Sequence, residues 1–259
     1  MKKTIIALLA LGGLASAAIT DAVQSSVSSG DTTVSLDILA QDWTTGSRLG
    51  RPTWVKDDAG DLTLTNSNWS QAYAIHDLST NVTGVWTLTT SVYRPSNTAG
   101  FSITLVGLDK ALTIGTQDYG SGTSYYGTTT NVTANGYSFQ DALGEISGTK
   151  VENSTKGAEN VFNNNQTANI SASTALDNDN NVLLTLTLDG TADVTPYTTT
   201  INMGKGFTLD KIVVWGDGAN GTANWKVTDL NLTYSVPEPT TATLSLLALA
   251  GLAARRRRK

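Results

Sequence analysis

The 259-residue sequence contains no cysteine and only one histidine, His76. The absence of cysteine excludes disulfides, thiolate metal sites and cysteine nucleophiles, so stability must come from core packing and strand pairing. One histidine cannot build a zinc site of several histidines, and any Ser-His-Asp triad would have to use His76. Because His76 is adjacent in sequence to Asp77, the pair sets up no triad geometry, and we expect His76 at the surface or at a rim.

Charged residues are scarce, at 15% of the sequence, and the positive ones concentrate at the two ends. Without residues 1–17 and 236–259, the 17 basic residues fall to 10 and the 22 acidic residues to 21, which gives a formal charge of −11. An acidic domain disfavours nucleic acids and anionic polymers as partners, so we expect no nucleic acid. It suits neutral glycans or divalent cations.

Thr, Asn, Gly, Ser and Asp dominate the middle of the chain, which is poor helix composition and good strand-and-turn composition. Runs of mostly alternating polarity predict half-buried antiparallel strands. They cover residues 34–39, 85–93, 101–107, 182–188, 209–215 and 225–234. Asp-Gly and Asn-Gly pairs at 189–190, 217–218 and 220–221 are typical of the turns between strands. Helical periodicity is not sustained anywhere in 18–235, although 140–146 or 155–162 could hold one helical turn.

These strands predict an all-β fold, an antiparallel two-sheet sandwich, rather than a barrel or β-helix, because no fixed-period repeat is present. Residues 207–215 and 225–234 are two hydrophobic runs that contain Trp215 and Trp225. They resemble the closing strands of concanavalin A-like lectin and glucanase jelly rolls. That resemblance implies a jelly-roll sandwich that either binds or hydrolyses glycans. Trp43, Trp54, Trp86, Trp215 and Trp225 are expected in the core.

The first 17 residues predict a secretion signal helix. Two lysines precede an apolar core at 5–14, and small residues at Ala15 and Ala17 suit cleavage before Ala18. An uncleaved membrane anchor is the alternative, which the shortness of the apolar core disfavours. We therefore expect export by the general secretion machinery.

The last 24 residues combine three features in a fixed order. Pro237, Glu238 and Pro239 keep the chain extended and accessible to an enzyme. Residues 240–254 are uncharged, and as a helix would rise about 22 Å, a short span for a hydrocarbon core of about 30 Å. The basic cluster that follows would stay on the cytoplasmic side; it consists of Arg255, Arg256, Arg257, Arg258 and Lys259. A frayed amphipathic tail or a tag is the alternative.

This tail is similar to PEP-CTERM sorting signals, the substrates of bacterial exosortases. The resemblance covers 236–259. It implies temporary retention in the inner membrane through the C-terminal helix, and processing near Pro237, Glu238 and Pro239 by a membrane-embedded cysteine protease-transpeptidase. The released protein would reach the cell surface or extracellular polymer. The expected organisation is a signal peptide at 1–17, a β-sandwich at 18–235 and a sorting tail at 236–259.

Two groups of residues are candidates for ligand binding. Tyr119, Tyr125 and Tyr126 lie in a Gly/Thr-rich stretch at 115–136, where exposed rings would stack on a glycan. The alternative is that these tyrosines lie on the sheet. Asp177 and Asp179 belong to an oxygen-rich run that could bind calcium, but Asp and Asn also form turns, and we expect the turn.

The sequence says less about the function of the middle domain than about where the protein is sent. We expect a non-catalytic sandwich, a matrix component or glycan-binding module that needs no cofactor. The alternatives are a divergent glycoside hydrolase that uses Glu145 or Glu152, and a purely structural surface protein. The acids lack the Glu-x-Asp-x-x-Glu pattern of glucanases, in which the carboxylates share one face of a strand.

Overall fold

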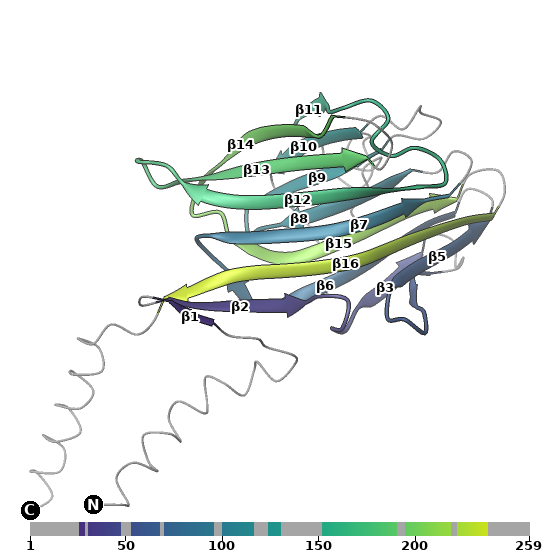
Figure 1. Cartoon of the computed structure of the whole chain (residues 1–259), viewed down its shortest axis with the longest axis horizontal. Helices are drawn as coiled ribbons and strands as arrows, with labels where there is room; N and C mark the ends of the chain where they lie inside the picture. The colour runs from purple at the N-terminus through teal and green to yellow at the C-terminus, as the bar shows by residue number, and fades with distance from the viewer. Residues whose placement is uncertain are drawn as a thin grey trace, which may run out of the picture.

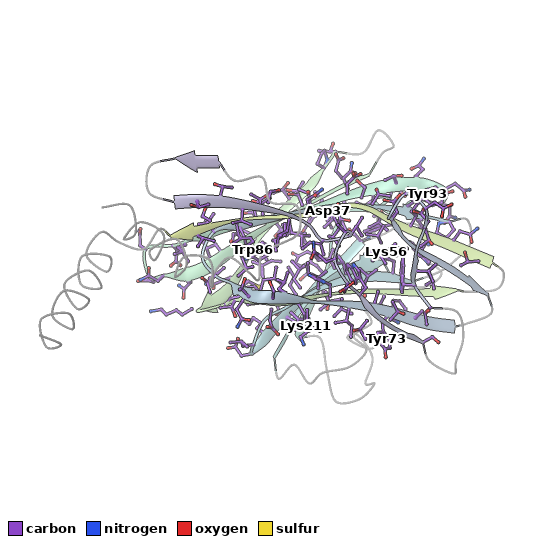
Figure 2. All side chains as sticks on the ribbon, turned by 90° about the horizontal axis from the view of Figure 1, so that it is seen from below. Asp37, Lys56, Tyr73, Trp86, Tyr93 and Lys211 are labelled. Carbon is purple, nitrogen blue, oxygen red and sulfur yellow. The ribbon has the colours of Figure 1, made fainter. Side chains whose placement is uncertain are left out.

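The computed structural model describes residues 26–28, 31–47, 53–67, 70–95, 100–116, 124–130, 152–190, 195–218 and 222–237. In these ranges the protein is all-β, as predicted, and its strands form two antiparallel sheets packed face to face (Figures 1 and 2). The expected signal helix at 1–17 and the apolar segment at 240–254 lie outside the described residues.

The larger sheet has nine strands and contains both the first and the last strand of the described fold. Its strands are β1 (Ser26–Ser28), β2 (Asp31–Asp37), β4 (Val55–Lys56), β5 (Leu62–Ser67), β7 (Trp86–Arg94), β12 (Gln166–Leu176), β13 (Asn181–Gly190), β14 (Tyr197–Lys205) and β16 (Thr222–Pro237). The main order is β1-β2-β16-β7-β12-β13-β14, with β5 paired to β16 and β4 to β5.

The smaller sheet has seven strands in the order β11-β10-β9-β8-β15-β6-β3. These are β3 (Thr44–Ser47), β6 (Ser70–Val82), β8 (Phe101–Val106), β9 (Lys110–Thr116), β10 (Ser124–Thr130), β11 (Glu152–Lys156) and β15 (Leu209–Gly218). Every pairing in both sheets is antiparallel.

The core fills the space between the sheets, where alternate residues of each strand point inward. Along β7 and β13, buried residues alternate with partly or fully exposed ones, as the polarity pattern predicts. Trp54, Trp86, Trp215 and Trp225 are at most 2% exposed, and the label in Figure 2 marks Trp86 between the sheets. Trp43 is partly buried against the core.

Three local predictions differ from the structure. The pairs at 189–190 and 217–218 are not turns, because each continues a strand, β13 or β15, and pairs with the neighbouring strand. All six residues of β8 are buried, so this strand is not half-buried. In 155–162 the structure has the end of β11 followed by turns, with no helix; residues 140–146 lie outside the described residues.

Candidate functional site

A polar hollow lies on the outward face of the nine-stranded sheet, across β7, β12 and β13 and beside β16. Its volume is about 330 Å³, which is at the lower end of the range of about 300–1,000 Å³ for ligand pockets. We call it the polar hollow, and its lining consists of Thr89, Thr90, Ser91, Asn169, Ile170, Ser171, Thr187, Asp189 and Asp229.

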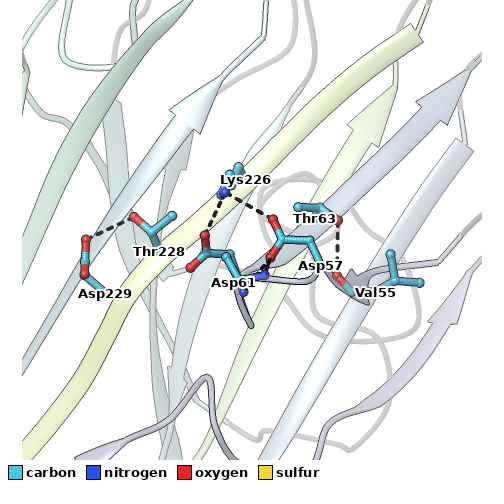
Figure 3. Close-up of polar contacts among 8 residues, drawn as sticks. Val55, Asp57, Asp61, Thr63, Lys226, Thr228 and Asp229 are labelled. Atoms are coloured by element: carbon cyan, nitrogen blue, oxygen red, sulfur yellow. Dashed lines mark hydrogen bonds and ion pairs between the residues drawn. The ribbon is translucent and has the colours of Figure 1, made fainter.

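The rim on the β16 side is formed by a bulge in that strand. The pairing of β16 with β7 shifts between Thr228 and Asn231, so β16 contains one extra residue at this point, and its residues 229 and 230 lie opposite Thr90 alone. Asp229 has a left-handed backbone with φ of 53°, and Leu230 is fully buried. Thr90 Oγ1 donates to Thr228 O at 3.0 Å and so bridges the interrupted ladder. Thr228 Oγ1 donates to the Asp229 carboxylate at 3.2 Å (Figure 3).

The walls offer hydrogen-bond donors and acceptors together. Ser91 Oγ donates to Asn169 Oδ1 at 2.8 Å, and the amide of Asn169 also carries two N–H donors. The hydroxyls of Ser171 and Thr187 can donate or accept, while Asp189 and Asp229 accept. The described lining contains no Lys, Arg or His. This set suits a neutral ligand with many hydroxyls better than an anion.

Near the polar hollow, Lys226 of β16 is held by the turn that joins β4 to β5 (Figure 3). Its Nζ lies 2.7 Å from Asp61 Oδ2 and 3.1 Å from Asp57 Oδ2. Hydrogen bonds to these two carboxylates raise the pKa of Lys226, and the hydrogen bond from Lys226 lowers the pKa of Asp57. Asp57, Asp58 and Asp61 belong to a turn that is closed by hydrogen bonds to Asp57 and Asp61. The sequence does not reveal that Lys226 is their basic partner, since Lys226 is 169 positions from Asp57.

The predicted glycan-contacting tyrosines do not form an exposed cluster in the described structure. Tyr126 is only 9% exposed, and its hydroxyl lies 3.3 Å from the Tyr197 hydroxyl and 3.4 Å from Thr199 Oγ1. The exposure expected for Tyr126 is therefore wrong, because its ring is on the inward face of β10. Tyr125 is partly buried on that strand, and its contact with a glycan stays a prediction. Tyr119 lies outside the described residues.

The candidate calcium loop is closed by its own hydrogen bonds. Asp177 Oδ1 accepts the backbone N–H groups of Asp179 and Asn181 at 2.9 and 2.8 Å, and Oδ2 accepts the Asn181 side chain at 2.8 Å. The Asn181 side chain is the main cause that lowers the pKa of Asp177. Both oxygens thus accept hydrogen bonds within the turn, which agrees with the expected turn, and calcium binding by Asp177 and Asp179 stays a prediction. In the described part of the chain, no three His, Cys, Asp or Glu side chains gather around a metal-sized space.

The residues considered for catalysis are not brought together by the described structure. His76 is 8% exposed, so the surface position expected for it is wrong. Its Nδ1 lies 2.9 Å from Asp42 O, and its ring centroid is 5.5 Å from that of Trp43. Glu152 begins β11 in the seven-stranded sheet, whereas Glu145 lies outside the described residues.

The sorting motif begins in the last strand of the sandwich. Pro237 ends β16 and pairs with Asp31 at the start of β2. Glu238, Pro239, the basic cluster at 255–259 and the cleavage residues Ala15, Ala17 and Ala18 lie outside the described residues. Among the residues that the structure describes, there is no helix of the length and apolarity that crossing a bilayer requires.

Residues 235–259 match the PEP-CTERM protein-sorting motif. The similarity inferred from the tail is thereby confirmed, and the motif implies a membrane-processed, exported protein. No curated protein sequence matches the chain.

Solved structures with the same fold are lectin-like. The potassium-bound carbohydrate recognition domain of Emp46p has a TM-score of 0.50 and 14% identity, over 77% of this chain and 95% of that chain. The legume lectin-like domain from Entamoeba histolytica has a TM-score of 0.50 and 10% identity, over 76% of this chain and 92% of that chain. At such identities the likeness shows the fold alone, and it confirms the lectin-like sandwich.

Proposed function

We propose that this is an exported, exosortase-processed protein of the cell surface or extracellular matrix whose sandwich binds a neutral glycan without catalysis. The PEP-CTERM motif at 235–259 supports the sorting part. The polar hollow is the observation that carries the binding part, because it joins hydroxyl, amide and carboxylate groups on a sandwich with the fold of a carbohydrate recognition domain.

A monosaccharide unit suits the polar hollow in both size and chemistry. Sugar hydroxyls donate and accept, as do the Ser and Thr hydroxyls of the lining. Tyr93 is partly buried on the same face of β7 as Ser91, two positions further on and outside the lining itself, and we expect a sugar that extends beyond the polar hollow to stack its C–H face on this ring. Affinity for one unit is expected to be weak, since few contacts offset the entropy lost on association.

Two carboxylates in the polar hollow make a glycoside hydrolase the second candidate. Asp189 on β13 and Asp229 on β16 line the same space, and most glycosidases use a pair of carboxyl groups. The catalytic acid of such a pair is normally kept protonated by burial in apolar surroundings, whereas Asp229 is exposed and Asp189 is only partly buried among polar side chains. The lack of a fully buried carboxyl in this pair favours binding over hydrolysis.

Titration with a panel of neutral and acidic oligosaccharides, with an assay for released reducing ends, tests the proposal. We expect binding of a neutral member and no release. Asn169→Ala should weaken binding by about 3- to 10-fold, the effect of one or two lost hydrogen bonds. Asn81→Ala, an exposed position on β6, is the matched control and should change nothing. Release of reducing ends that Asp189→Asn abolishes would establish the hydrolase, and no binding to any member would leave a structural surface protein.

Sorting is tested separately in cells. Changing Pro237, Glu238 and Pro239 together to alanine should leave a longer form in the membrane fraction, because the extended segment that the protease reads is lost. Changing Thr240 and Thr241 to alanine is the matched control, and this variant should be processed like the parent. Normal processing and release of the triple-alanine variant would overturn the sorting part of the proposal.

A further inference from the structure

Large exposed hydrophobic side chains gather at one end of the sandwich. In the described part of the chain they are Val55, Val85, Leu108, Leu176 and Val236, at 55%, 53%, 67%, 49% and 40% exposure. All except Val55 lie at the end where β16 leaves the sheet and enters the sorting motif, the left end in Figure 1. We call this end, with Val85, Leu108, Leu176 and Val236, the tail end.

Three of these residues come from neighbouring strand ends, because β16, β7 and β12 are adjacent. The backbone N–H of the residue before Val236 donates to Val85 O at 3.4 Å. Thr174 Oγ1 donates to Gly84 O at 2.8 Å, which ties the end of β12 to the turn that holds Val85. Leu176 is the last residue of β12. The three side chains therefore lie at the same end of the nine-stranded sheet, where these strands start or finish.

Leu108 lies at the same end of the other sheet, in the turn between β8 and β9. The first residues of β15 pair with the last residues of both β8 and β6, so β8 and β6 finish at the same end of the sheet, on either side of β15. The short turn that leaves β6 at Val82 contains Val85 and leads into β7. Leu108 and Val85 thus stand on turns at the same end of the sandwich.

The chain itself places the tail end next to the uncharged stretch of the sorting tail. Only two residues separate Pro237 from the uncharged stretch at 240–254, and this connection reaches at most about 11 Å. We propose that the tail end docks on the lipid surface, with Val85, Leu108 and Leu176 in contact with the membrane interface before processing. The inference rests on the proposed function, in which the sorting tail keeps the protein in the membrane until it is processed, with residues 240–254 as the segment expected to enter the bilayer.

The charges at the tail end indicate which lipid it meets. Its turns carry the exposed carboxylates of Asp109 and Asp179 and the partly buried Asp177, against the cations Lys110 and Lys205. This balance gives no attraction to an anionic surface. Docking must come from apolar contact, so a zwitterionic bilayer should serve as well as an anionic one and added salt should not release the domain.

Weak apolar contacts are sufficient for docking because the sorting tail tethers the domain to the membrane. A tether turns docking into an intramolecular step with a high effective concentration. Each side chain is about half exposed, so covering its exposed part should shift the ratio of docked to undocked domain by roughly tenfold. Three such contacts are enough to make the docked state dominant.

The absence of cysteine makes the test direct, since each introduced thiol is unique. Full-length Val85→Cys, Leu108→Cys and Leu176→Cys are labelled with an environment-sensitive fluorophore. Each is reconstituted at one copy per phosphatidylcholine vesicle with a lipid-borne quencher. We expect a blue shift and quenching at all three positions. Val55→Cys is the matched exposed control, roughly 35 Å away along the strands, and it should show neither.

A label at Leu247→Cys, inside the apolar stretch, separates this inference from the proposed function. Quenching at Leu247 without quenching at Leu108 would overturn tail-end docking alone. No quenching at Leu247 would overturn the membrane part of the proposed function and this inference with it. Quenching at Leu108 that requires several copies per vesicle would point to a second copy as the partner and would also overturn docking on lipid.

A second measurement tests the apolar origin of docking. With the label at Asp109→Cys, the combined change of Val85, Leu108 and Leu176 to serine should lower the docked-to-undocked ratio by about tenfold per substitution. Val55→Ser is the control and should leave the ratio unchanged. Undiminished quenching in the triple-serine variant, or docking only on phosphatidylserine vesicles, would overturn the proposal.

Discussion

Thr174 joins the end of β12 to the turn before β7, and we predict that Thr174→Val lowers the free energy of unfolding by about 2 kcal/mol. Thr174 Oγ1 accepts the backbone N–H of Trp86 at 2.9 Å and donates to Gly84 O at 2.8 Å. Thr174 is 5% exposed and Trp86 is 1% exposed. Water therefore cannot replace the hydroxyl as the partner of the Trp86 N–H.

The magnitude follows from which groups lose a partner. Valine keeps the shape and the strand preference of threonine but has no hydroxyl. The buried Trp86 N–H is then left without an acceptor, which costs about 1–3 kcal/mol. Gly84 is only partly buried, so its carbonyl can bond to water and adds little. In a domain of this size, about 2 kcal/mol lowers Tm by roughly 4–8 °C.

Thermal unfolding of the full chain in detergent, followed by circular dichroism and tryptophan fluorescence, measures the effect. Thr185→Val is the matched control: its hydroxyl lies on the outward face of β13, 3.5 Å from Thr200 Oγ1, and its loss should change stability by less than about 0.5 kcal/mol. A Tm change for Thr174→Val no larger than that of the control would refute the dependence of the Trp86 N–H on this hydroxyl.

Gly115→Ala should prevent β8 and β9 from pairing, because its Cβ would lie 2.0 Å from Phe101 O; soluble protein with a parent-like circular dichroism spectrum would contradict this. Tyr126→Ala should lower the free energy of unfolding by about 3 kcal/mol in chemical denaturation, as for a buried aromatic ring, and a near-zero change would show that the ring is dispensable. The pKa of Asp57 lies below its ordinary value of 3.8, so its pairing with Lys226 stabilises the fold above that value and is lost as pH falls through the lowered pKa. The parent should therefore lose stability more steeply in acid than Lys226→Met, whereas parallel stability curves would show that the pairing contributes nothing.

The sequence predicted the architecture because alternation of polarity along a strand reports directly which face is buried. The runs at 85–93 and 182–188 correspond to β7 and β13 for this reason. The same signal is weak where both faces are buried, as in β8. The pair at 189–190 has a strong local preference for a turn, but β12 is long enough to pair with it, and the ladder continues.

The polar hollow was beyond prediction because its lining depends on register between strands far apart in the sequence. Ser91 meets Asn169 only through the pairing of β7 with β12, and the sequence does not specify that pairing. The bulge at Asp229 leaves only a weak signal in the sequence: aspartate tolerates a left-handed backbone better than most residues, but many aspartates do not adopt one. The burial of Tyr126 was missed because aromatic rings among Gly and Thr suit a loop and an inward strand face equally well.

β16 is the last described strand, yet it occupies an inner position between β2 and β7 and also pairs with β5. Before residues 222–237 are present, β1 can pair only with β2 and β4 only with β5. The nine-stranded sheet cannot be completed, because both pairs join it through β16. The contact of Asp31 with Pro237 is among the longest in sequence that the fold makes, and contacts of this kind form slowly. In the export that we propose, with the N-terminus leading, the sandwich would complete folding only after the strand that carries the start of the sorting motif has crossed the membrane. The same strand thus completes the sandwich and contains the first residues of the sorting motif.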